Sequence, residues 1–231
     1  MGHEFTGVAW DAPGGIDFHS AWNCRPLATI AQAMRASLWA TAATTTLKGR
    51  LSSNCTIQAA GLATRMMLRA RTRRQGKPLE DRFALNDVVI TKGALSRIID
   101  LSVAIGGQPV MRVRADGLIV ATPTGSSAYN LAAGGPVVHP EVDAILLTPI
   151  APHMLTNRPV IVPGASDVRV EPLMDGANEE VFVTFDGQSG HALQADDVIE
   201  IRRAERPLRL VRARKRTYFE LLRQKLKWGE R

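Results

Sequence analysis

Apolar and polar residues alternate in short runs from about Arg65 to the end of the chain, and turn residues separate the runs. Met67–Arg73 alternates in this way before the turn Gln75-Gly-Lys77. Ile98–Ile105 and Val110–Val113 flank a Gly-Gly pair. Because neighbouring side chains of a strand point to opposite faces, the alternation predicts strands, and the Gly-Gly pair predicts a hairpin.

Strands of the same kind account for most of the remaining sequence, and two helices accompany them. One short helix is expected to begin near Ser127, and a C-terminal helix with one apolar face is expected at Tyr218–Leu226. The further strands are expected at Phe83–Ile90, Gly117–Ala121, Ala144–Pro149, Pro159–Val162, Val168–Pro172, Val181–Phe185, Val198–Arg202 and Leu208–Arg212. Strands without helices between them predict a mixed α/β chain with a β-rich, sandwich-like domain over residues 65–231, not a Rossmann half.

The first 64 residues have a different character. No acidic residue occurs from Phe18 to Leu79, and three of the four tryptophans lie in the first 40 residues. Residues 31–41 favour one helix, but little sustained period surrounds them. An acid-poor, Arg- and Ser-rich composition is typical of a transit peptide, and a wrongly assigned reading frame or start gives the same impression. Residues 1–64 are therefore treated as an atypical, truncated or aberrant segment, misread or disordered.

The chain carries a formal net charge of +7, from 29 basic and 22 acidic residues. This charge is consistent with an anionic partner and equally with a solvated basic surface. The basic residues gather weakly at Arg69–Lys77 and Arg202–Lys227, with few aromatic residues between them. Because platforms for nucleic acid combine basic and stacking aromatic side chains, no nucleic-acid partner is predicted.

Membrane, metal and disulfide functions find little support in the sequence. No run of about 18 apolar residues is present, so no membrane partner is expected. The start of the chain lacks the pattern of a secretory signal. Cys24 and Cys55 are the only cysteines, and neither belongs to a cluster of metal-ligand spacing. A cytoplasmic protein without a protein-ligated metal is the resulting expectation.

Asn86 and Asp87 interrupt an otherwise apolar run that is predicted as a strand. Adjacent side chains on a strand point to opposite faces, so at least one of the two should face the core side. A buried amide or carboxylate without partners is costly, which leaves two interpretations. The pair either forms a turn at a strand edge or grips the vicinal hydroxyls of a ribose.

The stretch from Arg114 to Pro136 holds the densest chemistry. After the apolar run it reads Thr122-Pro-Thr-Gly-Ser-Ser-Ala-Tyr129 and ends in Gly-Gly-Pro136. Backbone amides, hydroxyls and one aromatic face suit a nucleotide, whereas a capping turn at Ser126 or Ser127 is the simpler alternative. No Gly-Lys-Ser/Thr follows, so the loop is not a Walker A motif, and no Gly-x-Ser-x-Gly elbow is present.

Three shorter motifs, each with a simple structural interpretation, accompany the loop. These are Thr148-Pro-Ile-Ala-Pro-His153, Asn157-Arg-Pro159 and Asp186-Gly-Gln188, of which the last is either a strand-to-turn exit or part of a site. Leu85-Asn-Asp-Val-Val89 precedes the loop, and Phe219–Trp228 ends the series. Taken together and in this order, the motifs resemble those of the NAD kinase family, and the resemblance extends from about Arg65 to the end.

The resemblance implies transfer of a phosphate from ATP to the 2′-hydroxyl of the adenosine ribose of NAD, which gives NADP. It implies that Asn86 and Asp87 hold ribose hydroxyls, and that Tyr129 frames the adenine together with Ser127 and Ala128. It further assigns to the dinucleotide site Arg97, Arg114, Asp116, Asn130, Leu131, Ala132 and Gln188. Mg²⁺ or another divalent metal is implied as cofactor, NAD and ATP as partners, and a homodimer or homotetramer as the assembly.

The chain departs from the family pattern at several positions. Ser127, Asn130 and Ala132 stand where the family usually has Thr, Ser and Ser, and Asp87 stands where Glu is common. The family's Gly-Gly-Asp-Gly motif, whose Asp takes the proton from the 2′-hydroxyl, is not found, and Gly14-Gly-Ile-Asp17 is only a superficial echo. Loss of a general base costs orders of magnitude in rate. The sequence therefore predicts a chain that is inactive or nearly so, with a non-catalytic dinucleotide-binding remnant as the alternative.

Overall fold

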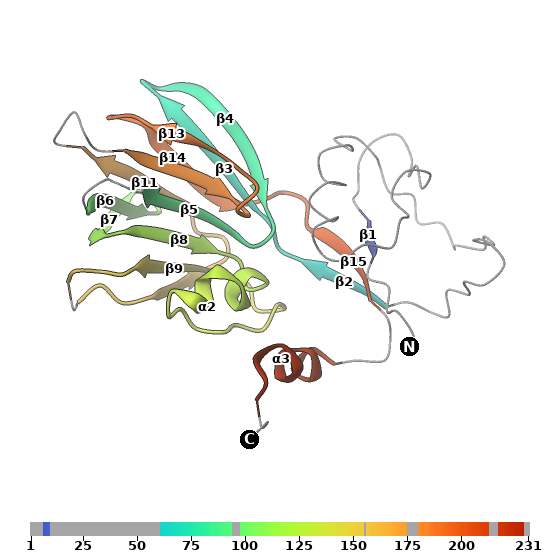
Figure 1. Cartoon of the computed structure of the whole chain (residues 1–231). Coiled ribbons are helices and arrows are strands. Elements are labelled where there is room, and N and C mark those ends of the chain that lie inside the picture. The colour runs from blue at the N-terminus through green and yellow to red at the C-terminus, as the bar shows by residue number, and fades with distance from the viewer. Residues whose placement is uncertain are drawn as a thin grey trace. The chain divides into compact units, whose positions relative to one another are not determined.

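The computed structural model describes residues 7–9, 61–93, 98–154, 156–174, 180–212 and 217–228. Internal contacts divide the chain into two compact units: residues 65–207 form one, and residues 1–64 with 208–231 form the other. Two stacked sheets make up the unit over residues 65–207 (Figure 1). The predicted domain over residues 65–231 and this compact unit differ at their C-terminal ends.

The first sheet has six antiparallel strands in the order β10-β9-β8-β5-β12-β13. Its strands are β5 Asp87–Lys92, β8 Gly117–Ala121, β9 Ala144–Ile150, β10 Val160–Pro163, β12 Val181–Phe185 and β13 Ser189–Leu193. A 3₁₀ turn, η1 (Gly125–Ser127), and the short helix α2 (Tyr129–Ala132) follow β8.

The second sheet also has six antiparallel strands, in the order β4-β3-β14-β11-β6-β7. Its strands are β3 Leu68–Arg74, β4 Lys77–Ala84, β6 Ile99–Ile105, β7 Gln108–Ala115, β11 Val168–Leu173 and β14 Val198–Arg203. The chain passes from β4 of this sheet to β5 of the first sheet through a two-residue bend at Leu85–Asn86.

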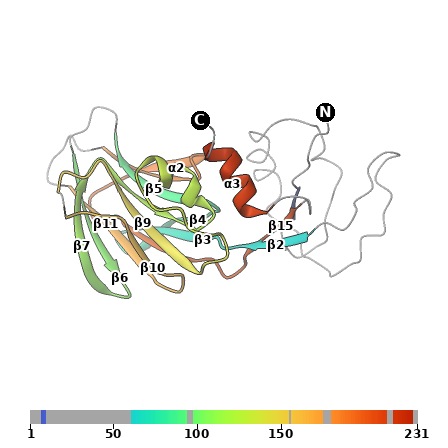
Figure 2. The same ribbon diagram turned by 90° about the horizontal axis from the view of Figure 1, so that it is seen from below.

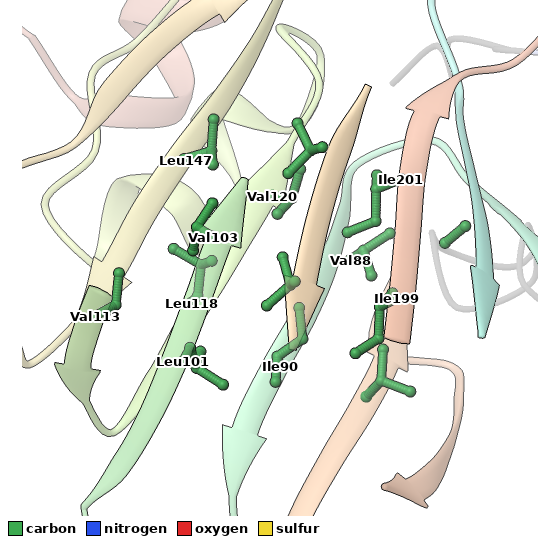
Figure 3. Close-up of a cluster of buried hydrophobic side chains, with 14 of the residues drawn as sticks. Val88, Ile90, Leu101, Val103, Val113, Leu118, Val120, Leu147, Ile199 and Ile201 are labelled. Atoms are coloured by element: carbon green, nitrogen blue, oxygen red, sulfur yellow. The ribbon is translucent and has the colours of Figure 1, made fainter. Parts of the chain in front are cut away.

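Apolar side chains from the facing sides of the two sheets form the main core. Figure 3 shows Val88, Leu118 and Leu147 of the first sheet among side chains of the second, such as Leu101 and Ile199. All five are fully buried. Burial of one such side chain contributes about 1.5–3 kcal/mol, so this layer is the main source of the unit's stability.

A smaller apolar cluster covers the opposite face of the first sheet. Val89 of β5, Ile119 of β8 and Leu146 of β9 pack there against Val138 from the segment after α2. The helix α2 itself lies against β8, and Figure 2 shows it beside β5 of the same sheet. Because β8 is thus buried on both faces, its residues read as a continuous apolar run and not as an alternating one.

The described part of the other unit contains a three-stranded sheet and one helix. The sheet has the order β1 (Gly7–Ala9), β15 (Leu208–Arg212), β2 (Gly61–Arg65). The helix α3 (Tyr218–Leu226) begins with a capping box between Thr217 and Glu220. None of the helices in the described ranges has the length and apolar character needed to cross a membrane.

Most of the predicted elements are confirmed. The hairpin around Gly106-Gly107 is formed by β6 and β7, and the strands at 117–121, 181–185 and 208–212 and the helix at 218–226 have their predicted bounds. The short helix near Ser127 is observed as η1 and α2. The helix predicted over residues 31–41 lies outside the described residues.

The prediction of one continuous strand over Phe83–Ile90 is wrong. Phe83–Ile90 is not continuous, because β4 ends at Ala84 and β5 begins at Asp87, with Leu85 and Asn86 in the bend between them. Asn86 therefore lies in a connection between the two sheets. The sequence did not show this break, because apolar residues such as Leu85 and Val88 stand on both sides of Asn86 and Asp87, as they would in one continuous strand. Four of the described strands were also not expected from the sequence, namely β1, β2, most of β4 and all of β13. Of these, β4 and β13 are exposed edge strands with mainly polar or small residues.

Candidate functional site

A cleft of about 320 Å³ lies on the first sheet, beside the start of β5. Its walls come from the bend and β5, from the segment between η1 and α2, and from the end of β12. The residues that line it are Asn86, Asp87, Val89, Thr91, Ala128, Tyr129, Thr184, Asp186 and Gly187. Its volume falls at the lower end of the range of small-molecule sites.

The loop after β8 is fastened directly onto the Leu85–Asn86 bend. Thr122 donates its hydroxyl to the carbonyl of Leu85 (2.6 Å) and its amide to the carbonyl of Asn86 (2.9 Å). The same hydroxyl accepts the amide of Gly125 (3.0 Å). A Cβ on Gly125 would lie 2.1 Å from the carbonyl oxygen of Asn86, so only glycine allows this approach.

Asp186 fastens the same bend from the other side. Its carboxylate accepts the amides of Leu85 (2.8 Å), Asn86 (2.7 Å) and Asp87 (3.0 Å). Its own amide donates to the carbonyl of Asp87 (2.9 Å). The residue adopts a left-handed conformation, with φ of 50°, at the turn that follows β12. Asp and Asn tolerate this conformation better than most residues do. In Asp186 it turns the carboxylate toward the bend.

Asp87 presents a buried carboxylate to the cleft. Its exposure is only 4%, and within the described ranges no group donates a hydrogen bond to that carboxylate. Burial, and secondarily the negative charge of Asp186, raises the pKa of Asp87 to about 6. Because this carboxylate lines the cleft, its acceptor oxygens are left to water or to a ligand that brings its own donors.

The raised pKa of Asp87 predicts a pH-dependent penalty on folding. An acid whose pKa is higher in the folded state stabilises the fold below its unfolded pKa, and this contribution disappears as the pH rises through about 6. The replacement Asp87→Asn puts an uncharged side chain of similar shape at this position at every pH. We expect it to raise the free energy of unfolding by up to about 3 kcal/mol at pH 7 and by little at pH 4. Urea unfolding of both proteins across this range measures the difference, and equal stability at pH 7 would contradict the prediction.

The segment that carries Tyr129 combines an exposed ring with buried polar anchors. Tyr129 lines the cleft and is 47% exposed. Asn130 is fully buried: its amide donates to the carbonyls of Ser126 and Pro136 (both 3.1 Å), and its Oδ1 accepts the hydroxyl of Thr148 (2.6 Å). The Ser126 hydroxyl in turn donates to the carbonyl of Pro123 (2.6 Å) and accepts the amide of Val138 (3.0 Å). These interior bonds hold the ring at the rim.

The structure brings some of the residues predicted for the site together and leaves others apart. Asn86, Asp87, Ala128 and Tyr129 share the cleft. Outside its lining lie Ser127, Asn130, Leu131, Ala132 and Gln188, of which the last is exposed in the turn after Asp186. Arg97 lies outside the described residues. A ligand contact by the side chain of Asn130 would have to replace one of its interior bonds, and that contact stays a prediction.

Arg114 and Asp116 occupy a different place on the sandwich. Arg114 lines a second cleft of about 490 Å³, whose walls are Asp100, Met111, Arg112, Arg114, Met154, Thr156 and Asn157. Asp116 lies beyond the far end of β5, where its carboxylate is 3.3 Å from the ammonium group of Lys92. His153 is exposed, and its amide donates to the carbonyl of Arg114 (3.0 Å).

Sequence reasoning missed the importance of Asp186 and Thr122 for the site. Both act through main-chain groups of the bend, and no local pattern shows such long-range bonds. Asp186 had the two interpretations of a turn or a site residue, and in the structure it both ends β12 and lines the cleft. Val89 and Thr91 also line the cleft, because alternate residues of β5 face it.

The chemistry of the cleft favours neutral donors over anions. Two carboxylates, one amide side chain and one tyrosine line it, and among the residues that the structure describes no lysine or arginine does. The described residues contain no group of three or more His, Cys, Asp or Glu side chains that would hold a metal. The oxygens of Asp186 are already engaged by three amides. Hydroxyl groups beside a flat ring that packs on Tyr129 match this lining best.

Known proteins are similar to the part of the chain that holds this cleft. A sequence model of the ATP-NAD kinase C-terminal domain matches residues 85–213. Similar curated proteins include the NAD kinase of Geotalea daltonii, 52% identical over 170 residues, and that of Geobacter sulfurreducens, 49% identical over 167 residues. The matches cover 74% and 72% of this chain and 59% and 58% of those proteins. The chain thus spans about three-fifths of the length of these relatives.

Solved structures give the same result. The crystal structure of yeast NADH kinase complexed with NADH is similar with a TM-score of 0.70 and 27% identity, over 74% of this chain and 52% of that one. The crystal structure of an NAD kinase from Archaeoglobus fulgidus in complex with ATP has a TM-score of 0.58 and 27% identity. That match covers 73% of this chain and 61% of the other.

Proposed function

The chain belongs to the ATP-NAD kinase family, and from this premise we propose that its cleft binds the adenosine half of NAD for phosphorylation of the ribose 2′-hydroxyl by ATP. The observation that carries the proposal is the buried carboxylate of Asp87, which has no donor from the described residues and stands beside Asn86. The vicinal hydroxyls of a ribose supply two donors to such a pair. Tyr129 at the rim offers its ring to the adenine.

The groups of the cleft account for binding and orientation of the sugar. Because phosphoryl transfer relies mainly on positioning and charge neutralisation, a ribose held at two hydroxyls is presented in a defined geometry. The phosphates of both substrates need cations, and none of the lining residues in the described part of the chain is cationic. The described residues offer no resident metal site either, so we confine the proposed divalent ion to the one that accompanies the phosphates of ATP.

The proposal includes a low rate of transfer for this chain. The sequence contains no Gly-Gly-Asp-Gly, the motif to which the family resemblance assigns the base that takes the proton from the 2′-hydroxyl. We therefore expect binding of NAD without appreciable formation of NADP. A rapid, ATP-dependent appearance of NADP from the purified chain would overturn this part of the proposal and leave the binding site standing.

The test of the site is calorimetric titration of the full chain with NAD. We expect the change Tyr129→Ala to weaken binding about tenfold, because stacking of a base on an aromatic ring contributes about 1–3 kcal/mol. Tyr129→Phe keeps the ring and should bind nearly as the original chain does. Because Tyr129 is 47% exposed, neither change should lower the unfolding temperature much, and the thermal melt serves as the control. Absence of NAD binding by the folded chain would refute the proposed site.

A homodimer or homotetramer belongs to the same proposal. The family resemblance assigns Arg114 to the ligand that Asn86 and Asp87 hold, yet Arg114 lines a different cleft of the chain. A second copy offers one route by which the two sets meet around one ligand. Sedimentation equilibrium with and without NAD measures the assembly, and a monomer that binds NAD at full strength would exclude this route.

A further inference from the structure

The bend that presents Asn86 and Asp87 to the cleft is held by one side chain from another strand. The carboxylate of Asp186 accepts the three consecutive amides of Leu85, Asn86 and Asp87 at 2.7–3.0 Å. The first two of these amides lie between β4 and β5, in the two-residue connection outside both strands. A charged acceptor forms stronger bonds than a neutral one, so the bend is fixed from its amide side by this single group.

The other side of the bend is fixed without charge. Thr122 donates its hydroxyl to the carbonyl of Leu85 and its amide to the carbonyl of Asn86. Asp186 and Thr122 thus hold opposite polar groups of the same two residues. The two differ in one respect, because only Asp186 places a negative charge near the buried carboxylate of Asp87.

We propose that Asp186 is a positioning residue of the nucleotide site, which orients Asn86 and Asp87 through their backbone and makes the ligand affinity of Asp87 sensitive to pH. This inference rests on the proposed function for the identity of the ligand, while the action of Asp186 on Asp87 is present in the free protein. Both carboxylate oxygens of Asp186 are occupied by amides, so its geometric effect reaches the ligand through its neighbours.

The charge of Asp186 has a defined consequence for Asp87. Burial contributes most to the raised pKa of Asp87, and the nearby Asp186 contributes next; no other charged group of the described residues is among the causes. A ribose hydroxyl donates more strongly to an ionised carboxylate than to a neutral acid. Affinity for NAD should therefore be full above pH 7 and fall as the pH drops through about 6.

The informative change is Asp186→Asn. Asparagine tolerates the left-handed φ of 50° and keeps one acceptor oxygen, but it cannot accept all three amides and carries no charge. We expect NAD to bind about tenfold more weakly at pH 8, because bonds to a charged acceptor are lost. We also expect the midpoint of the pH dependence to move below that of the original chain. Asp196→Asn is the matched control, since Asp196 is also left-handed (φ of 66°) but exposed and absent from the cleft lining.

A second change separates geometry from charge. Thr122→Val removes the hydroxyl that binds the carbonyl of Leu85 and leaves the charge of Asp186 in place. Affinity should fall while the midpoint stays near 6. In an Asp87→Asn background, the pH dependence should vanish and Asp186→Asn should cost less affinity, because coupled residues are not additive. An equal loss in both backgrounds with an unmoved midpoint would show that Asp186 does not act through Asp87.

A ligand-free measurement keeps the two proposals distinguishable. Carbon-detected NMR follows the Asp87 carboxyl of the full chain during a pH titration, with the signal assigned by Asp87→Asn. We expect its midpoint near 6 in the original chain and lower in Asp186→Asn. A midpoint in the ordinary range of an aspartate in the original chain would overturn the inference, even if Asp186→Asn did not fold. A chain that shows the expected titration but no affinity for NAD would refute only the proposed function.

Discussion

Replacement of Gly125 by alanine is expected to lower the free energy of unfolding by about 3 kcal/mol or more and to abolish measurable NAD binding. The added Cβ would meet the carbonyl oxygen of Asn86 at 2.1 Å, its carbonyl carbon at 2.5 Å and its Cα at 2.6 Å. All three are backbone atoms, so no side-chain rotation relieves the contact. The loop must move away from the bend, and Tyr129 and Asn86 then no longer face one cleft.

Urea unfolding and NAD titration measure the two parts of this expectation. Gly107→Ala is the control, because nothing lies within 4 Å of its Cβ position while its φ of 79° makes any side chain unfavourable. That change should cost only about 1–2 kcal/mol of backbone strain and leave NAD binding unchanged. If Gly125→Ala binds NAD as the original chain does, the cleft does not depend on the close contact between loop and bend.

The change Asn130→Ala is expected to destabilise the fold by about 4 kcal/mol. It leaves two buried groups without their partner, the carbonyl of Ser126 and the hydroxyl of Thr148, and it also removes the bond to the carbonyl of the exposed Pro136. It also opens a cavity, because Asn130 is fully buried. Since these bonds hold the segment that carries Tyr129, NAD affinity should fall together with stability.

A double-mutant cycle with Thr148→Val identifies the origin of this effect. The single change at Thr148 should cost about 1–3 kcal/mol, because it leaves Oδ1 of Asn130 unpaired. Both changes together should cost less than the sum of the two. Asn157→Ala is the control: its Nδ2 is buried and has no hydrogen-bond partner within the described ranges, so its loss should matter little. Additive costs at Asn130 and Thr148 would mean that the 2.6 Å bond contributes nothing.

The sequence predicts those elements best whose residues face a core. The two-residue alternation in β6, β11 and β12 and the continuous apolar run of β8 reflect burial on one face or on both. The edge strands β4 and β13 bury little and are held by pairing with β3 and β12, so their sequences lack this signal. The hydrogen bonds of β4 and β13 are made with the neighbouring strands, and the pattern of apolar residues in a sequence does not indicate such pairing.

The candidate site divides in the same way. Asn86 and Asp87 were predicted for the site because a polar pair in an apolar run is conspicuous, and Tyr129 because it offers an aromatic face beside hydroxyls in a segment that resembles the family's. The place of Asn86 in a bend was not predicted, because the groups that satisfy the bend lie on Asp186 and Thr122, far away in sequence. A polar side chain such as that of Asn130 is typical of a ligand contact. In the structure it is turned inward, where it accepts the hydroxyl of Thr148, and local sequence does not show this partner.

The long reach of these contacts has a consequence for how the protein folds. The bonds from Asp186 to the bend join residues 99 to 101 positions apart, and the bond from Thr122 to Leu85 spans 37 positions. Closing such long loops is slow and occurs late in folding, because the chain loses conformational entropy before the new contacts stabilise it. A growing chain that ends before Asp186 lacks the group that closes the bend. NAD-binding competence should therefore arise only after β12 has joined β5, and ligand capture would report completed folding.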